Sequence, residues 1–121
     1  MSLHERLEKA TNDYKKLEQD LNSAVENRQR LDAQLTENEQ VQKEFATLKP
    51  ANTVYKLIGP VLVPQDQAEA KSNVEKRLEF IKSEIKRVEK LLKDLGEKSE
   101  KAKAEIVHIQ ALSQTQQPAE E

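Results

Sequence analysis

The sequence predicts a mainly α-helical protein, in which one long antiparallel two-helix coiled coil carries a single central β-hairpin. Two stretches place apolar residues at alternating steps of four and three, which is the heptad spacing of coiled-coil helices. Between them lies a nearly uncharged segment, rich in β-branched residues around Gly59-Pro60, which is typical of strand, turn and strand. The composition fits this class, because 36% of the residues are hydrophobic and 35% are charged, too little apolar volume for a compact core.

The first helix is predicted over residues 3–48. Its apolar seam would run through Leu3, Leu7, Ala10, Tyr14, Leu17, Leu21, Ala24, Arg28, Leu31, Leu35 and Asn38. Arg28 and Asn38 are polar, and we expect them to fix the register of the two helices at some cost in stability. The heptad rhythm slips after Asn38, and Pro50 ends the helix because the residue before a proline avoids the helical conformation.

The second helix is predicted over residues 67–113, with Asp66 as its N-cap. Its seam would run through Val74, Leu78, Ile81, Ile85, Val88, Leu92, Leu95, Ser99, Ala102, Ile106 and Ile109. At about 1.5 Å per residue each helix would be roughly 70 Å long, so folding back would bring both chain termini to one tip. We expect a single domain over residues 1–115 and a disordered tail over residues 114–121, which show no periodicity.

The central segment, residues 52–64, predicts a hairpin with two largely apolar faces. A period of two places Val54 and Ile58 on one face and Tyr55 and Leu57 on the other. A lone two-stranded hairpin is marginal in water, and its outer edges carry unpaired backbone groups. We therefore expect similar hairpins of other chains to cover it, through Val54, Tyr55, Leu57, Ile58, Val61, Leu62 and Val63. The alternative is a hydrophobic loop that only caps its own coiled coil.

Charge and motif content argue against several classes of function. The 20 basic and 22 acidic residues are mixed along the chain and give a net charge of −2, which argues against nucleic-acid or anionic-membrane binding. No cysteine is present, so no disulfide or thiolate metal site is expected, and neither a signal peptide nor a membrane-spanning run is predicted. Without a phosphate-binding glycine loop or a nucleophile motif, we expect no enzyme activity and no cofactor. His4 and His108 could approach each other at the tip, but two ligands make a poor metal site, so we expect solvated histidines.

The segment TVYKLIGPVLV, followed by a heptad helix that contains KRLEFI, resembles the β-class subunits of prefoldin. The resemblance covers nearly the whole chain, as helix, one hairpin and helix, and a single hairpin favours the β class because α-class chains carry two. Pro64 and Glu75 stand where Lys and Gly would be expected in typical relatives, and Pro64 would alter the end of the second strand.

The resemblance implies a heterohexamer of α-class and β-class subunits, in which the hairpins build β-barrels and the coiled coils project from them. It implies a cytoplasmic, ATP-independent chaperone that captures unfolded actin and tubulin and passes them to the cytosolic chaperonin. It also implies client contacts at the coiled-coil tip, residues 1–14 and 102–115, through Leu3, Leu7, Ala10, Ile106, Val107, Ile109 and Leu112. Two alternatives stay open: that these residues only close the coiled coil, and that the chain is a structural scaffold or adaptor without client binding.

Overall fold

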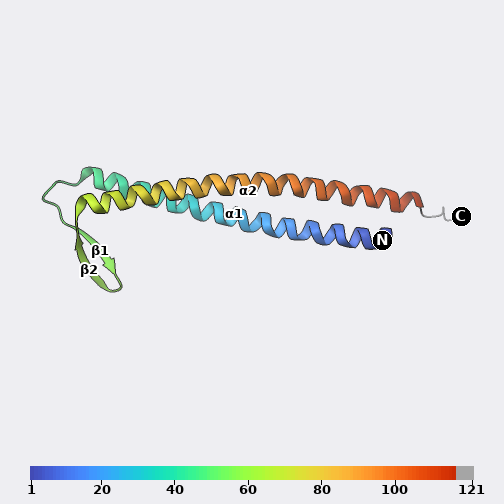
Figure 1. Cartoon of the computed structure of the whole chain (residues 1–121), viewed down its shortest axis with the longest axis horizontal. Coiled ribbons are helices and arrows are strands. Elements are labelled where there is room, and N and C mark those ends of the chain that lie inside the picture. Colours follow the sequence, from blue (N-terminus) through green and yellow to red (C-terminus); the bar gives the residue numbers. More distant parts are fainter. Residues whose placement is uncertain (117–121) are drawn as a thin grey trace. The chain divides into compact units, whose positions relative to one another are not determined.

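The computed structural model describes residues 1–116 as two long helices joined through a two-stranded hairpin (Figure 1). In chain order the elements are α1 (Leu3–Thr47), β1 (Val54–Ile58), β2 (Val61–Gln65) and α2 (Gln67–Gln116). The predicted class, mainly helical with one central antiparallel hairpin, is confirmed. The chain divides into two compact units, Met1–Asn27 with Val88–Glu121 and Arg28–Arg87, and each contains part of both helices.

The ends of the elements differ from the prediction by a few residues. α1 ends at Thr47 rather than at residue 48, and the strands occupy 54–65 rather than 52–64, because Asn52 is used in a turn after α1. α2 continues to Gln116 rather than to residue 113, since no glycine or proline lies between residue 113 and Pro118. The rest of the predicted disordered tail, residues 117–121, lies outside the described residues.

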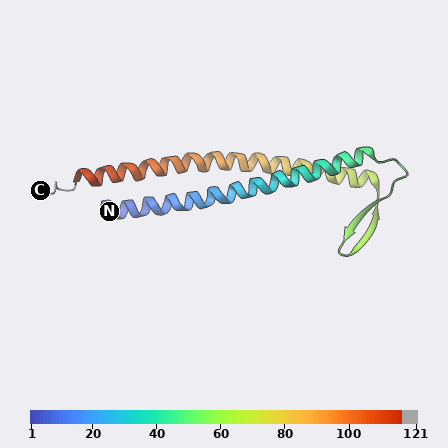
Figure 2. The same ribbon diagram turned by 180° about the vertical axis from the view of Figure 1, so that it is seen from behind.

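In the first unit, the N-terminal part of α1 and the C-terminal part of α2 run antiparallel, side by side (Figure 1, Figure 2). The predicted seam lies between them: Val88 is 0% exposed, Ile109 is 1% exposed, and Ala24, Leu95 and Ser99 are also buried. The remaining seam residues of this unit are half-buried, whereas most residues between them are exposed. Full burial of one large apolar side chain is worth about 1.5–3 kcal/mol, so this stripe accounts for the pairing of the helices here.

In the second unit the seam residues of α2 are buried, whereas those of α1 become more exposed after Leu31. Its buried apolar side chains are Leu31, Ala70, Val74, Leu78, Ile81 and Ile85. On α1, residues 39–44 are all exposed, Val41 included, although the helix continues unbroken to Thr47. The slip in the heptad rhythm after Asn38 therefore leaves the next residues of α1 exposed, but it does not break the helix.

Polar residues on the seam are hydrogen-bonded. In the first unit Ser99 Oγ donates to Glu18 Oε1 at 2.7 Å, a bond that links α2 to α1. In the second unit Asn38 Nδ2 donates to a backbone carbonyl of its own helix at 2.7 Å, and Arg28 pairs with Asp32 one turn further along. The register role expected for Arg28 and Asn38 stays a prediction. The Ser99 bond cannot be anticipated from spacing, because a serine on a seam also fits as a small residue.

Side-chain caps begin both helices. Ser2 Oγ accepts a hydrogen bond from the N–H of Glu5 at 3.1 Å at the start of α1. Asp66 Oδ2 accepts one from the N–H of Glu69 at 3.0 Å, which confirms the predicted N-cap of α2. Asp66 is also the only residue between β2 and α2, so one residue both joins and caps these elements.

The connector between α1 and β1, residues 48–53, is held by a tight turn. The N–H of Asn52 donates to the carbonyl oxygen of Lys49 at 2.9 Å, with Pro50 at the second turn position where its fixed φ is favourable. The N–H of Lys49 donates to Asn52 Oδ1 at 2.7 Å. Gln67 Nε2 donates to the carbonyl oxygens of Lys49 at 3.1 Å and Asn52 at 3.4 Å, so the first residue of α2 is bonded to the connector.

The hairpin turns through a two-residue loop, Gly59-Pro60, between the paired residues Ile58 and Val61. Gly59 has a φ of +58°, and no described residue other than glycine has a positive φ, so the φ of Pro60 is negative. A positive φ at the first loop position alone defines a type II′ turn, whereas type I′ requires it at both. The dipeptide therefore combines a glycine where a positive φ is needed with a proline where φ is negative.

The two glycines give a matched test of this turn. A Cβ added at Gly59 or at Gly96 would meet no atom within 4 Å, so alanine changes chiefly the backbone energetics at both positions. Gly59→Ala should lower the free energy of unfolding by about 1–3 kcal/mol, because the positive φ of Gly59 is one that residues with a side chain rarely adopt. Gly96→Ala, inside α2, should raise it by about 0.5–1 kcal/mol. Urea unfolding followed by circular dichroism measures both, and changes of the same sign would contradict the turn assignment.

The Ser99–Glu18 bond should contribute measurably to the pairing of the helices in the first unit. Ser99→Ala should lower the free energy of unfolding by about 0.5–1.5 kcal/mol, because it removes the donor of a part-buried bond. Glu18→Gln retains an acceptor oxygen and serves as the control, with a smaller loss. In a double-mutant cycle with Glu18→Ala, a coupling energy of zero would show that the bond does not stabilise the fold.

Candidate functional site

The register of the hairpin sorts its side chains into two faces. Tyr55 lies opposite Pro64 and Leu57 lies opposite Leu62, and these four residues form the apolar hairpin face. The other side, the mixed face, carries Val54, Lys56, Ile58, Val61, Val63 and Gln65. The predicted division of the strands is confirmed, and the only charged side chain of the two strands, Lys56, lies on the mixed face.

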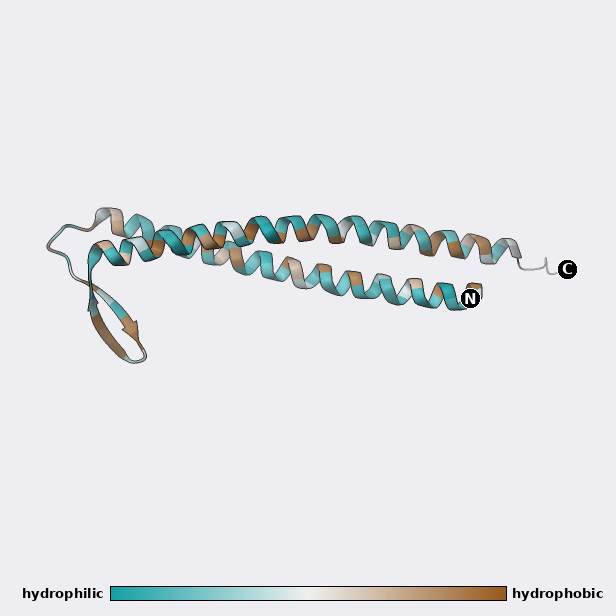
Figure 3. Cartoon of the chain, in the orientation of Figure 1, coloured by the Kyte–Doolittle hydropathy of each residue, from teal (hydrophilic) through white to brown (hydrophobic). Residues whose placement is uncertain are grey.

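The hairpin is largely uncovered. Leu57 is 67% exposed and Leu62 is 62% exposed, and Tyr55, Ile58 and Val61 are each more than half exposed. In Figure 3 both strands are coloured largely as hydrophobic, whereas the helices are mostly hydrophilic with separate hydrophobic patches. A two-stranded sheet with this much apolar surface in water has the properties of a contact surface for another chain.

The base of the hairpin, by contrast, lies against the helices of its own unit. Val54 and Gln65, which pair with each other, are the half-buried residues of the two strands. A shallow cavity of about 280 Å³ beside them is lined by Phe45, Val54, Tyr55, Lys56, Leu57, Gln65, Ala70, Asn73, Val74 and Arg77. The hairpin is therefore anchored at the end nearest the helices and open towards its loop.

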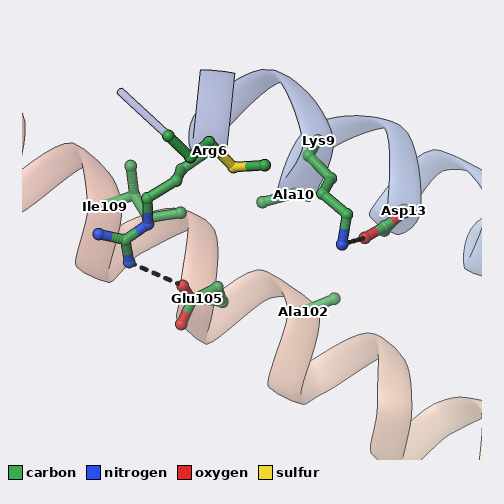
Figure 4. A pocket seen from close by; sticks show the side chains of 8 residues that line it. Arg6, Lys9, Ala10, Asp13, Ala102, Glu105 and Ile109 are labelled. Atoms are coloured by element: carbon green, nitrogen blue, oxygen red, sulfur yellow. Dashed lines mark hydrogen bonds and ion pairs between the residues drawn. The ribbon is translucent and has the colours of Figure 1, made fainter. Parts of the chain in front are cut away.

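In the first unit, the beginning of α1 and the end of α2 enclose a shallow pocket of about 310 Å³, here called the tip pocket (Figure 4). It is lined by Met1, Arg6, Lys9, Ala10, Asp13, Ala102, Glu105 and Ile109. Arg6 Nη2 lies 3.4 Å from Glu105 Oε1 across the two helices, and Lys9 Nζ lies 3.6 Å from Asp13 Oδ2 along α1. Ion pairs this exposed contribute about 0–1 kcal/mol, so an incoming side chain can displace them at little cost.

The residues predicted to contact clients differ in exposure. Val107 is 58% exposed, and Leu3, Leu7, Ala10, Ile106 and Leu112 are half-buried. Ile109 is 1% exposed, because its side chain packs within the seam between α1 and α2. This burial leaves little of the Ile109 side chain accessible, and client contact at all seven residues stays a prediction.

Some side chains on these surfaces are not revealed by the apolar pattern. Arg6 and Glu105, which border the tip pocket, each directly precede a seam residue, where long charged side chains pair across coiled-coil helices. Their position directly before a seam residue is the sequence feature that indicates such an ion pair. In the second unit Phe80 is 63% exposed. It lies off the seam, so it does not pack against the other helix.

The histidines and acidic side chains of residues 1–116 include no group of three or more that is arranged to hold a metal ion. His4 and His108 are both exposed. A hydrogen bond to Glu84 raises the pKa of Arg87 above its ordinary value, but arginine is charged at physiological pH in either case, so no pH dependence follows. Neither α1 nor α2, over the part of the chain described, is long and apolar enough to cross a membrane.

Two long helices joined through one largely exposed β-hairpin define the class of two-helix coiled-coil proteins with a central hairpin. A sequence profile described as "Prefoldin subunit" matches residues 8–114. The chain belongs to the prefoldin subunit family, whose members are components of a chaperone complex. The resemblance seen in the hairpin residues is thereby confirmed.

Individual relatives agree with this assignment. Prefoldin subunit 6 of Bos taurus is 42% identical over 117 residues, which cover 97% of this chain and 91% of that protein. Prefoldin subunit 6 of Arabidopsis thaliana is 44% identical over 113 residues, which cover 93% of this chain and 88% of that protein. The crystal structure of the prefoldin beta subunit from Thermococcus strain KS-1 matches with a TM-score of 0.75 at 22% identity, over 93% of this chain and 95% of that one, which confirms the fold.

Proposed function

We propose that this chain is a β-class subunit of a heterohexameric prefoldin and that it captures unfolded proteins without ATP. The observation that carries the proposal is the exposed apolar hairpin face, which is unfavourable in water until another chain covers it. The partners are α-class and other β-class subunits, the clients are unfolded actin and tubulin, and the recipient of the clients is the cytosolic chaperonin. The compartment is the cytoplasm, and the chain itself carries out no catalysis and takes no cofactor.

Assembly through the hairpin follows from two energetic terms. Burial of a large apolar side chain from full exposure is worth about 1.5–3 kcal/mol, and Leu57 and Leu62, which are 67% and 62% exposed, have roughly two thirds of that gain left. A neighbouring strand also pairs the backbone groups that the outer edges of the sheet leave free. Both terms favour the hairpin of another subunit, since it has an apolar face and an edge of its own.

Client capture is assigned to the tip, where the first unit exposes apolar groups beside weakly held charges. Val107 and the half-buried Leu3 and Leu112 provide exposed or partly exposed apolar surface. The tip pocket adds a concave apolar lining bordered by the Arg6–Glu105 ion pair. Such contacts are individually weak and tolerate many partner sequences, which suits capture and release without nucleotide hydrolysis.

A structural scaffold or adaptor without client binding is the second candidate. The burial of Ile109 favours it, because part of the predicted tip surface serves the coiled coil instead. Both candidates assemble through the hairpin and differ only at the tip, so substitutions at the tip separate them.

Leu57→Asp should abolish incorporation into the complex, because it would bury a charge on the apolar hairpin face at a cost of several kcal/mol. Tyr55→Asp and Leu62→Asp should have the same effect. Lys56→Asp is the matched control: it is the adjacent residue, lies on the mixed face and already carries a charge. Native mass spectrometry of the chain mixed with candidate α-class and β-class partners measures incorporation. Wild-type assembly of Leu57→Asp would refute the proposed role of the hairpin.

Alanine at Leu3, Val107 and Leu112 together should weaken the suppression of client aggregation by the assembled complex several-fold, because apolar contact surface is removed from the tip. Val25→Ala is the matched control, since Val25 is an exposed valine on α1 in the same unit but outside the tip pocket. Light scattering by actin diluted from denaturant, with the complex present, gives the readout. Full suppression by the triple variant would favour the scaffold.

A further inference from the structure

The register of the hairpin determines which backbone groups remain free for a further strand. Because Ile58 and Val61 flank a two-residue loop, they form a hydrogen-bonded pair and exchange both backbone bonds. Hydrogen-bonded and non-hydrogen-bonded pairs alternate along an antiparallel ladder. Tyr55, Leu57, Leu62 and Pro64 are in the non-hydrogen-bonded pairs, so their backbone polar groups are directed to the outer edges of the sheet.

The two outer edges therefore differ in hydrogen-bond donors. The edge of β1 offers both groups of Tyr55 and of Leu57, which makes two donors and two acceptors. The edge of β2 offers both groups of Leu62 but only the carbonyl of Pro64, which makes one donor and two acceptors. A proline is tolerated in a strand where its missing N–H would face away from the ladder, as it does here. The β1 edge is complete, and the β2 edge is blunted by Pro64.

The β1 edge also carries apolar side chains that fit one kind of partner. Tyr55 and Leu57 lie on the apolar hairpin face and are 55% and 67% exposed, so each offers backbone groups and apolar surface together. A strand that pairs here continues that face, and it matches if its alternate residues are apolar. A helix satisfies its own backbone groups and cannot use these donors and acceptors. The complementary partner is an extended strand with apolar alternate residues.

We propose that β1 is the principal strand-addition edge of this subunit and that its occupant is an outer hairpin strand of another prefoldin subunit. The inference rests on the proposed function and deepens it, since it assigns the stronger neighbour contact to one of the two strands. On the β2 side, a neighbour loses one hydrogen bond and meets the ring of Pro64. The two contacts of the subunit with its neighbours therefore differ in strength. When the complex dissociates, the contact at β1 is the last to break.

Amide hydrogen exchange in the unmodified complex tests the assignment without any substitution. The outward amides of Tyr55 and Leu57 should exchange rapidly in the isolated chain, whereas the inward amides of Lys56 and Val63 show that the hairpin is formed there. On assembly with partner subunits, Tyr55 and Leu57 should slow by at least about tenfold more than Leu62. Equal protection at the three outward amides, or stronger protection at Leu62, would overturn the proposal.

Paired proline and alanine variants isolate the contribution of each N–H. Leu57→Pro and Leu57→Ala both remove the leucine side chain, but only proline removes the outward donor, as Pro64 already does on β2. The Kd of the complex should be about fivefold higher for Leu57→Pro than for Leu57→Ala, whereas the same ratio at Leu62 should stay below about twofold. Titration of the labelled chain with partner subunits measures both ratios, and equal ratios would refute the edge assignment.

The two proposals fail in different ways. If Leu57→Asp assembles normally, the hairpin is not the assembly element and the proposed function fails with it. If Leu57→Asp abolishes assembly but the proline-to-alanine ratios at Leu57 and Leu62 are equal, only the assignment of β1 as the principal edge fails.

Discussion

The burial of a single apolar stripe is the constraint on which the rest of the structure depends. Two helices share one interface, and side chains such as Val88 and Ile109 are fully enclosed in it. Within residues 1–116 no further layer is present to cover apolar groups elsewhere, so those of the hairpin, Phe80 and Val107 stay exposed. The exposed apolar surface is therefore a consequence of the architecture and is available for other chains.

Helices and hairpin differ in what they can offer to a partner. A helix pairs its own N–H and C=O groups, so α1 and α2 present side chains only, except at their ends. The hairpin has free backbone groups on both outer edges in addition to its apolar face. Backbone pairing suits a permanent contact of fixed register, whereas loose side-chain contacts suit changing clients. This difference supports the proposal that the hairpin serves assembly and that the helix ends serve contact with unfolded chains.

Local sequence patterns determine most of the fold, because they act over a few residues. Heptad spacing locates the seam, Pro50 limits α1 to within a few residues, and Asp66 caps α2 as its type and position suggest. The type II′ turn is less accessible, since it depends on the φ values of Gly59 and Pro60 as well as on their identities.

The candidate sites depend on distances that no local pattern contains. Arg6 and Glu105 are 99 residues apart in sequence, and their ion pair borders the tip pocket only because the helix ends pack side by side. Ile109 has the same spacing as its half-buried neighbours on the seam, so spacing does not distinguish it as the one that is enclosed. Pro64 is evident in the sequence, but only the strand register shows that its missing N–H lies on the outer edge of β2.

The junction at Asp66 has a mechanical consequence. A single residue joins β2 to α2, and it contributes only two freely rotating backbone bonds. Its side chain is bonded to the N–H of Glu69, and the adjacent Gln67 is bonded to the connector, which restricts both rotations further. A rotation of the hairpin is therefore transmitted to the start of α2. The direction in which α2 begins is therefore tied to the orientation of the hairpin.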